Sequence, residues 1–167
     1  MRQVKIRRAV GGILTVGIMI LIFCMSAQDG TRSSDTSGGV VEFVLRLFVP
    51  NFEGLAAAEQ TALVEKYHLL IRKLAHFSIF LSLGLSCSMV TLTLPGKKRP
   101  VQLGLAALVG LLYAISDEIH QRFVPGRAGV ITDVLIDFSG VLTGLLALWL
   151  VLWCVEKKKG KKITLQG

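Results

Sequence analysis

Four long apolar runs constrain this chain more than any other feature of its sequence. They lie at about residues 9–25, 74–94, 101–121 and 130–153. A helix needs about 20 residues to cross the hydrocarbon core of a bilayer, which is about 30 Å thick. The third run is apolar only to Ser116, but nothing before Pro125 breaks a helix, so we expect this helix to continue to Gln121. The pattern predicts an all-α, multi-span transmembrane helix bundle with four spans, formed by residues 1–167 as a single domain.

Composition and cysteine placement agree with a membrane protein. Hydrophobic residues make up 52% of the chain, charged residues only 18%, and the mean hydropathy is +0.62. An ordinary soluble domain carries about 25% charged residues. Cys24, Cys87 and Cys154 all lie in apolar runs. We therefore interpret them as small hydrophobic residues, and not as a disulfide framework or a cluster of metal ligands.

Lysine and arginine in the flanks of the runs predict the orientation. Four lie within residues 2–8, three in the turn at 97–99 and five at 157–162, so these flanks hold twelve of the nineteen. Cationic flanks tend to remain cytoplasmic. We expect a multi-pass protein of the cell membrane with both termini cytoplasmic. The net charge of +8 then reflects orientation and contact with anionic lipids, and we expect no nucleic-acid partner.

The first run has a second interpretation. A basic start, an apolar core and small residues at Ser26 and Ala27 are also typical of a cleaved signal peptide, and Cys24 could mark a lipid-modified cysteine. Phe23, directly before Cys24, is bulkier than lipoprotein processing usually accepts. We therefore expect the first run to be retained as a span.

The segment between the first two spans divides into three parts. The stretch SAQDGTRSSDTSGG, residues 26–39, is rich in Ser, Gly and Asp and predicts a flexible loop. VVEFVLRLFVP, residues 40–50, predicts an amphipathic helix on the membrane surface or on the bundle, with Glu42 and Arg46 paired and Pro50 ending it. Residues 55–71 are expected to be helical and to run into the second span.

Unusual polar residues gather where this topology places the outer ends of the spans. Arg72 and His76 are four residues apart, and so are Asp133 and Asp137, so each pair shares one face of a helix. The full set of candidate site residues is Arg72, Lys73, His76, Asp117, Glu118, Gln121, Arg127, Asp133 and Asp137. We expect all nine to lie together at the outer leaflet.

Asp137 is the candidate that should lie deepest. An ionised carboxylate facing lipid costs about 2.5 kcal/mol or more near a helix centre. Asp137 should therefore face the bundle, either protonated or paired with Arg72, Lys73, His76 or Arg127. Such pairing also supports a purely structural interpretation, in which salt bridges pin the helices together.

Known catalytic and metal motifs do not match these residues. DEIHQ supplies one His where a zinc protease needs two in HExxH, and no GxSxG is present. Asp117, His120, Asp133 and Asp137 could in principle ligate a hard divalent cation. We expect no bound metal, and the sequence identifies no cofactor.

The ordered polar motifs resemble those of the VanZ-like family of bacterial membrane proteins. The resemblance runs from about Phe23 to Leu146 and rests on SAQ after the first span, RKLAHF opening the second, YAISDEIHQRFVPGR ending the third, and DVLIDFSGVLTG in the fourth. It implies a small multi-helix membrane protein of a family whose founding member is associated with teicoplanin resistance. This chain has Asp137 where the family often has Asn, and Phe80 where an aromatic hydroxyl is frequent.

These observations lead to one functional hypothesis with two alternatives. The cluster is expected to bind a lipid headgroup or a lipid-linked cell-envelope precursor, with Arg72, Lys73 and Arg127 on phosphate and the carboxylates orienting these cations. The first alternative is a membrane enzyme that modifies such a ligand, using Asp117, Glu118, His76 or His120. The second is a structural or partner-binding membrane subunit.

The predicted topology can be tested by cysteine labelling. In intact cells a membrane-impermeant maleimide should label a cysteine introduced at Ser34 and should not label one at Gly96, because these positions are expected on opposite faces. Lysed cells provide the control, since both positions should then react. Labelling at Gly96 in intact cells would contradict the four-span orientation.

Overall fold

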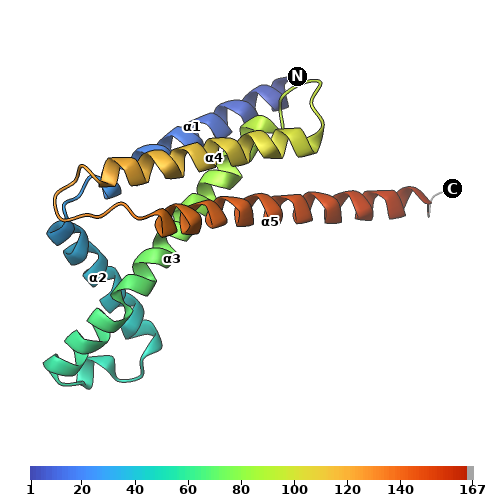
Figure 1. Cartoon of the computed structure of the whole chain (residues 1–167). Helices are drawn as coiled ribbons and strands as arrows, with labels where there is room; N and C mark the ends of the chain where they lie inside the picture. The colour runs from blue at the N-terminus through green and yellow to red at the C-terminus, as the bar shows by residue number, and fades with distance from the viewer. Residues whose placement is uncertain (165–167) are drawn as a thin grey trace.

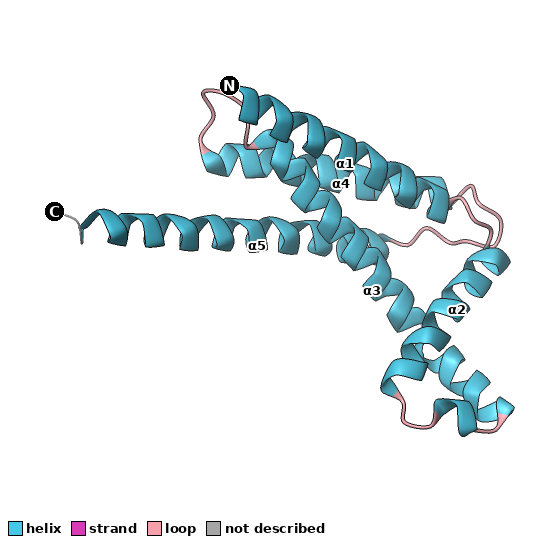
Figure 2. Ribbon diagram, turned by 180° about the vertical axis from the view of Figure 1, so that it is seen from behind, coloured by secondary structure: helices cyan, strands magenta, loops and turns pink. Residues whose placement is uncertain are grey.

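The computed structural model describes residues 1–164, and within them the side chains of all but residues 31–36 and 158–164. The described residues form five α-helices and one short 3-10 helix, with no strand (Figures 1 and 2). The elements are α1 (Arg2–Ser26), α2 (Gly30–Phe48), η1 (Phe52–Gly54), α3 (Ala57–Thr91), α4 (Arg99–Gln121) and α5 (Ile131–Thr164). Among them, α1, α3, α4 and α5 are long and apolar enough to cross a membrane. The predicted all-α fold with four spans is confirmed.

Helix α3 is the central element of the bundle. It packs against α1, α2, α4 and α5, and its closest association is with α5. Helices α1 and α4 lie side by side and run in the same direction (Figure 1). The polar ends of the four spans, at residues 26, 72–76, 117–121 and 133–137, therefore meet at one end of the bundle, as the sequence predicts.

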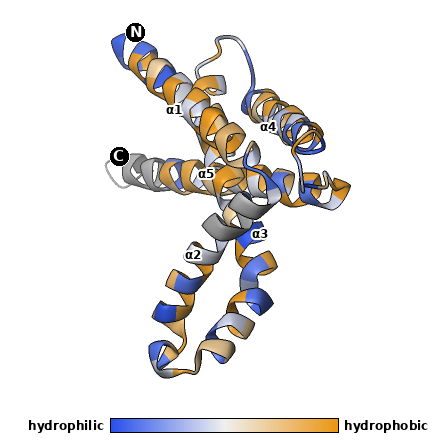
Figure 3. Ribbon diagram, turned by 90° about the vertical axis from the view of Figure 1, so that its left-hand side faces the viewer, coloured by the Kyte–Doolittle hydropathy of each residue, from blue (hydrophilic) through white to orange (hydrophobic). Residues whose placement is uncertain are grey.

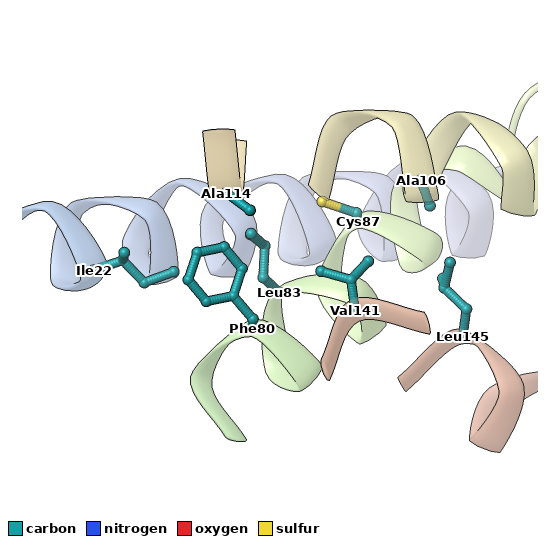
Figure 4. Close-up of a cluster of buried hydrophobic side chains, with 8 residues drawn as sticks. All are labelled: Ile22, Phe80, Leu83, Cys87, Ala106, Ala114, Val141 and Leu145. Carbon is teal, nitrogen blue, oxygen red and sulfur yellow. The ribbon is translucent and has the colours of Figure 1, made fainter. Parts of the chain in front are cut away.

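A small apolar core holds the spans together (Figure 4). Phe80 and Leu83 of α3 are completely buried, and the small residues Ala106 and Ala114 let α4 approach them. The other members are Ile22, Cys87, Val141 and Leu145. Most of the remaining apolar side chains on α1, α4 and α5 point outward, so these helices are mainly hydrophobic on their surfaces (Figure 3). This surface suits contact with lipid chains.

Two glycines set the close approach of α5 to α3. A Cβ atom at Gly140 would overlap the carbonyl oxygen of Phe77, and one at Gly144 would overlap that of Leu81. Small residues spaced four apart allow helix backbones to approach in this way. The glycine pair thus serves packing within the bundle.

The segment between α1 and α3 differs from the sequence prediction. The prediction of a flexible loop over residues 26–39 is wrong except at residues 27–29, because α2 already begins at Gly30. The N–H of Gly30 donates to the carbonyl of Pro125 at 3.0 Å, which fixes the start of the helix. Weak loop preferences of Ser, Gly and Asp yield to such tertiary contacts.

Helix α2 and the first half of α3 form a hairpin that projects from the bundle (Figures 1 and 2). Val41 and Leu45 are buried with Phe52 against the apolar side of α3. On the other side, Arg46 pairs with Glu42 at 2.7 Å and with Glu53 at 2.9 Å. The predicted amphipathic helix and the continuous run into the second span are both confirmed, and Figure 3 shows hydrophilic and hydrophobic residues alternating along the hairpin.

Alanine at Gly140 should destabilise the bundle, because its methyl group has no room beside the backbone of α3. Overpacking of this kind typically costs about 1–3 kcal/mol. Gly17→Ala is the matched control, since nothing lies within 4 Å of a Cβ atom there. We expect Gly140→Ala, but not Gly17→Ala, to lower the unfolding temperature in detergent. Equal unfolding temperatures would contradict the packing role.

Candidate functional site

A polar cavity of about 150 Å³ lies between α3, α4, α5 and the α4–α5 loop. Eight of the nine residues predicted from the sequence line it. They are Arg72, Lys73, His76, Glu118, Gln121, Arg127, Asp133 and Asp137. The ninth, Asp117, adjoins the cavity through its hydrogen bond with Gln121. The structure thus brings the predicted cluster together at one place.

Asp117 is held by two polar side chains at the junction of α1 and α4. The hydroxyl of Ser26 and the amide of Gln121 each donate to Oδ2 at 2.9 Å. All three side chains are buried. Ser26 is a member of the site that we did not predict. The SAQ motif was the available signal, but a lone serine after an apolar run does not identify its own partner.

The α4–α5 loop is fixed by polar contacts on both sides. Glu118 accepts a hydrogen bond from the N–H of Val130 at 2.9 Å, next to the start of α5, where N–H groups lack helical partners. Arg127 donates to the carbonyl of Ser26 at 3.0 Å, at the end of α1. Gly126 has a φ of +72°, which favours glycine. The loop therefore joins α1 to α5 and positions Arg127 at the cavity.

Arg127 lies in the electrostatic field of the neighbouring Arg72. Burial lowers the pKa of Arg127 from its ordinary value, and the nearby charge of Arg72 lowers it further, while Asp117 and Glu118 act in the opposite direction. Arginine nonetheless stays charged at neutral pH. Two guanidinium groups near one cavity create an environment that favours an anion.

Arg72 differs from the other cations of the cavity. Lys73 pairs with Asp133 at 3.1 Å, and Arg127 contacts the end of α1. Among the described residues, Arg72 has neither an ion pair nor a hydrogen bond, yet it lines the cavity and is partly accessible. Its guanidinium group is therefore available to a ligand.

Asp137 lies at the buried side of the cluster. Its side chain is 1% exposed, and neither carboxylate oxygen has a hydrogen-bond partner in the described structure. The nearest cationic candidate is Nδ1 of His76, at 3.7 Å, which is beyond hydrogen-bonding distance. Asp137 faces the bundle as predicted. Of its four predicted partners, only His76 forms a close pair with it in the structure.

An apolar hollow adjoins the polar cavity. It has a volume of about 70 Å³ and shares Arg72, His76 and Arg127 with the cavity. Met25 and Ala75 line this hollow and also a smaller one that continues to Ile79. Polar and apolar surfaces thus meet along one side of α3, with Arg72 and His76 between them.

His120 lies apart from the cavity. Its ring stacks on Phe23 with 4.6 Å between the ring centroids, and it is not among the lining residues. The sequence-based idea that His120 joins Asp117, Asp133 and Asp137 around a cation is therefore not matched by the geometry. The side chain stabilises the contact between α1 and α4.

A family model described as VanZ/LLP1 matches residues 12–152. The chain belongs to the VanZ/LLP1 family. The matched range contains every residue of the cavity and most of the four spans. No curated protein and no solved structure matches the chain. For this VanZ/LLP1 protein, function must therefore be inferred from the site itself.

Removing the hydroxyl of Ser26 should destabilise this VanZ/LLP1 protein. Asp117 would lose one of two donors while remaining buried, which typically costs about 1–3 kcal/mol. Ser116→Ala is the control, because that hydroxyl is exposed and donates only to the carbonyl of Tyr113 in its own helix. Thermal unfolding in detergent should show a drop for Ser26→Ala alone. A similar drop for both variants would argue against a special role of Ser26.

Proposed function

We propose that this VanZ/LLP1 protein binds a lipid with an anionic phosphate headgroup at the outer leaflet. The observation that carries the proposal is Arg72, a guanidinium group without an ion pair among the described residues, placed between a polar cavity and an apolar hollow. A lipid headgroup joined to an acyl or prenyl chain has the same two-part chemistry. Both membrane phospholipids and lipid-linked envelope precursors belong to this class.

The polar cavity suits a phosphate group. Arg72 and Arg127 can each offer planar pairs of N–H donors, the geometry that matches phosphate oxygens. Lys73 adds a third positive charge, and Asp133 holds it in place at 3.1 Å. No described carboxylate forms an ion pair with Arg72. A phosphate bound beside these groups would compensate its positive charge.

The apolar hollow favours a lipid over a free anion. A soluble phosphate would fill only the polar cavity and would leave the surface of Met25 and Ala75 uncovered. A chain lying against these residues removes apolar surface from contact with water, worth about 25 cal/mol per Å². The lipid chain and the headgroup would then both contribute to the binding free energy.

The contacts also separate this proposal from the two alternatives. A structural clamp explains the pairing of Lys73 with Asp133 and of Glu118 with Val130, but it gives no role to Arg72. An enzyme with a hydroxyl or thiol nucleophile is less well supported, because none of the described residues that line the polar cavity is a Ser, Thr or Cys. General acid or base chemistry by Glu118 or His76 remains the form that an enzyme would take here.

The link to teicoplanin rests on the family resemblance alone. Teicoplanin is a lipoglycopeptide, and a site for lipid-linked envelope components offers one route by which such a protein could influence tolerance. The lipid proposal does not depend on this link.

Lipid binding can be measured on the purified protein by native mass spectrometry. We expect phosphatidylglycerol to bind more strongly than diacylglycerol, which has the chains without the phosphate, and more strongly than inorganic phosphate. Arg72→Gln should weaken phosphatidylglycerol binding at least tenfold, because one charge-assisted contact contributes about 1.5–3 kcal/mol.

Arg46→Gln provides the matched control for Arg72→Gln. Arg46 is exposed on α2, pairs with Glu42 and Glu53, and lines neither hollow. Its loss should leave lipid binding unchanged. Equal binding of phosphatidylglycerol and diacylglycerol, or equal effects of the two substitutions, would refute the proposal.

A further inference from the structure

Three possible metal ligands from three helices converge at the buried side of the polar cavity. His76 of α3, Asp117 of α4 and Asp137 of α5 each present one ligand atom, and these atoms lie within 4.8 Å of one another. Ligands that surround one ion at about 2.0–2.2 Å are separated by about 3–4.4 Å. A small movement of side chains would therefore suffice to place all three on a single ion.

Asp137 supplies the independent sign that a cation belongs here. The carboxylate is 1% exposed, and neither of its oxygens accepts a hydrogen bond from a described group. Burying an ionised carboxylate without a partner is strongly unfavourable. His76 lies 3.7 Å away, too far for a hydrogen bond but suitable for a second ligand of the same ion.

Asp117 is oriented in the way that ligating carboxylates usually are. Ser26 and Gln121 both donate to Oδ2, so neither of these two bonds engages Oδ1. Hydrogen bonds from outside the coordination shell commonly fix a metal ligand in this manner. They hold the carboxylate in one orientation before any ion arrives.

The distribution of charge around the cavity also favours a bound cation. Four carboxylates, from Asp117, Glu118, Asp133 and Asp137, stand against the three cations Arg72, Lys73 and Arg127. Lys73 is already paired with Asp133 and Arg127 contacts the end of α1, so neither neutralises Asp137.

We propose that His76, Asp117 and Asp137 bind one divalent transition-metal cation, Zn²⁺ or Mn²⁺. One imidazole and two carboxylates form a mixed nitrogen and oxygen set that suits these ions better than Mg²⁺, which prefers oxygen ligands and retained water. The sequence alone led us to expect no metal, because it predicts that these residues lie at one end of the bundle but not how closely their ligand atoms approach one another. The site stands on these three residues and does not require the proposed lipid function. If both proposals hold, a phosphate oxygen can serve as a further ligand.

Metal binding should be tested on the full-length protein in lipid-free detergent after removal of metals with a chelator. Titration with Mn²⁺, followed by electron paramagnetic resonance, should reveal one tight site per chain, and Zn²⁺ should displace the Mn²⁺. Asp137→Asn and His76→Ala should each weaken Mn²⁺ binding at least tenfold. The comparison uses only variants that show a cooperative unfolding transition without metal, which demonstrates that they are folded.

Glu65→Gln is the control for loss of a carboxylate. Glu65 is exposed on α3 and takes no part in the cluster, so this variant should bind Mn²⁺ like the original protein. Two results would overturn the metal site: no stoichiometric binding of Mn²⁺ or Zn²⁺, or binding that survives both Asp137→Asn and His76→Ala. Arg72→Gln separates the two proposals, because it should weaken phosphatidylglycerol binding at least tenfold and leave Mn²⁺ binding intact.

Discussion

The close contact between α3 and α5 is the constraint on which the polar site depends. Gly140 lies against the backbone of Phe77; Phe77 directly follows His76, and Gly140 lies three residues after Asp137. Because the backbones nearly touch there, the carboxylate of Asp137 is brought to 3.7 Å from the imidazole of His76. A larger residue at 140 would separate the helices and change the site as well as the packing. Helix packing and site geometry are therefore one feature of this bundle.

Polar groups at the ends of the spans also have to be satisfied in a largely apolar protein. Arg127 contacts the carbonyls at the end of α1, and Glu118 accepts the N–H of Val130 beside the start of α5. Unsatisfied helix ends are costly where water is scarce. Part of the charged cluster thus maintains the fold, while Arg72 makes no such contact among the described residues.

The sequence predicted which residues meet but not how they pair. Apolar run length and helical spacing place Arg72, His76, Asp133 and Asp137 at one end of the bundle, because both depend only on position along a helix. Pairing depends on rotation of one helix against another. For that reason we could not foresee that Lys73 reaches Asp133 or that Ser26 holds Asp117. The start of α2 at Gly30 was missed for a related reason, since its contact with Pro125 joins segments far apart in the chain.

The depth of the charges decides what kind of ligand the cavity can accept. Arg72 lies where the polar cavity meets the apolar hollow, whereas Asp137 is buried on the side of α5 that faces α3 and α4. An anion entering near Arg72 would meet the carboxylate of Asp137 if it moved deeper, and the repulsion would limit its approach. A divalent cation bound by Asp137, Asp117 and His76 would change the electrostatic potential at the inner end of the cavity from negative to positive. The same cavity would then attract phosphate along its whole depth, so occupancy of the metal site would strengthen binding of an anionic headgroup.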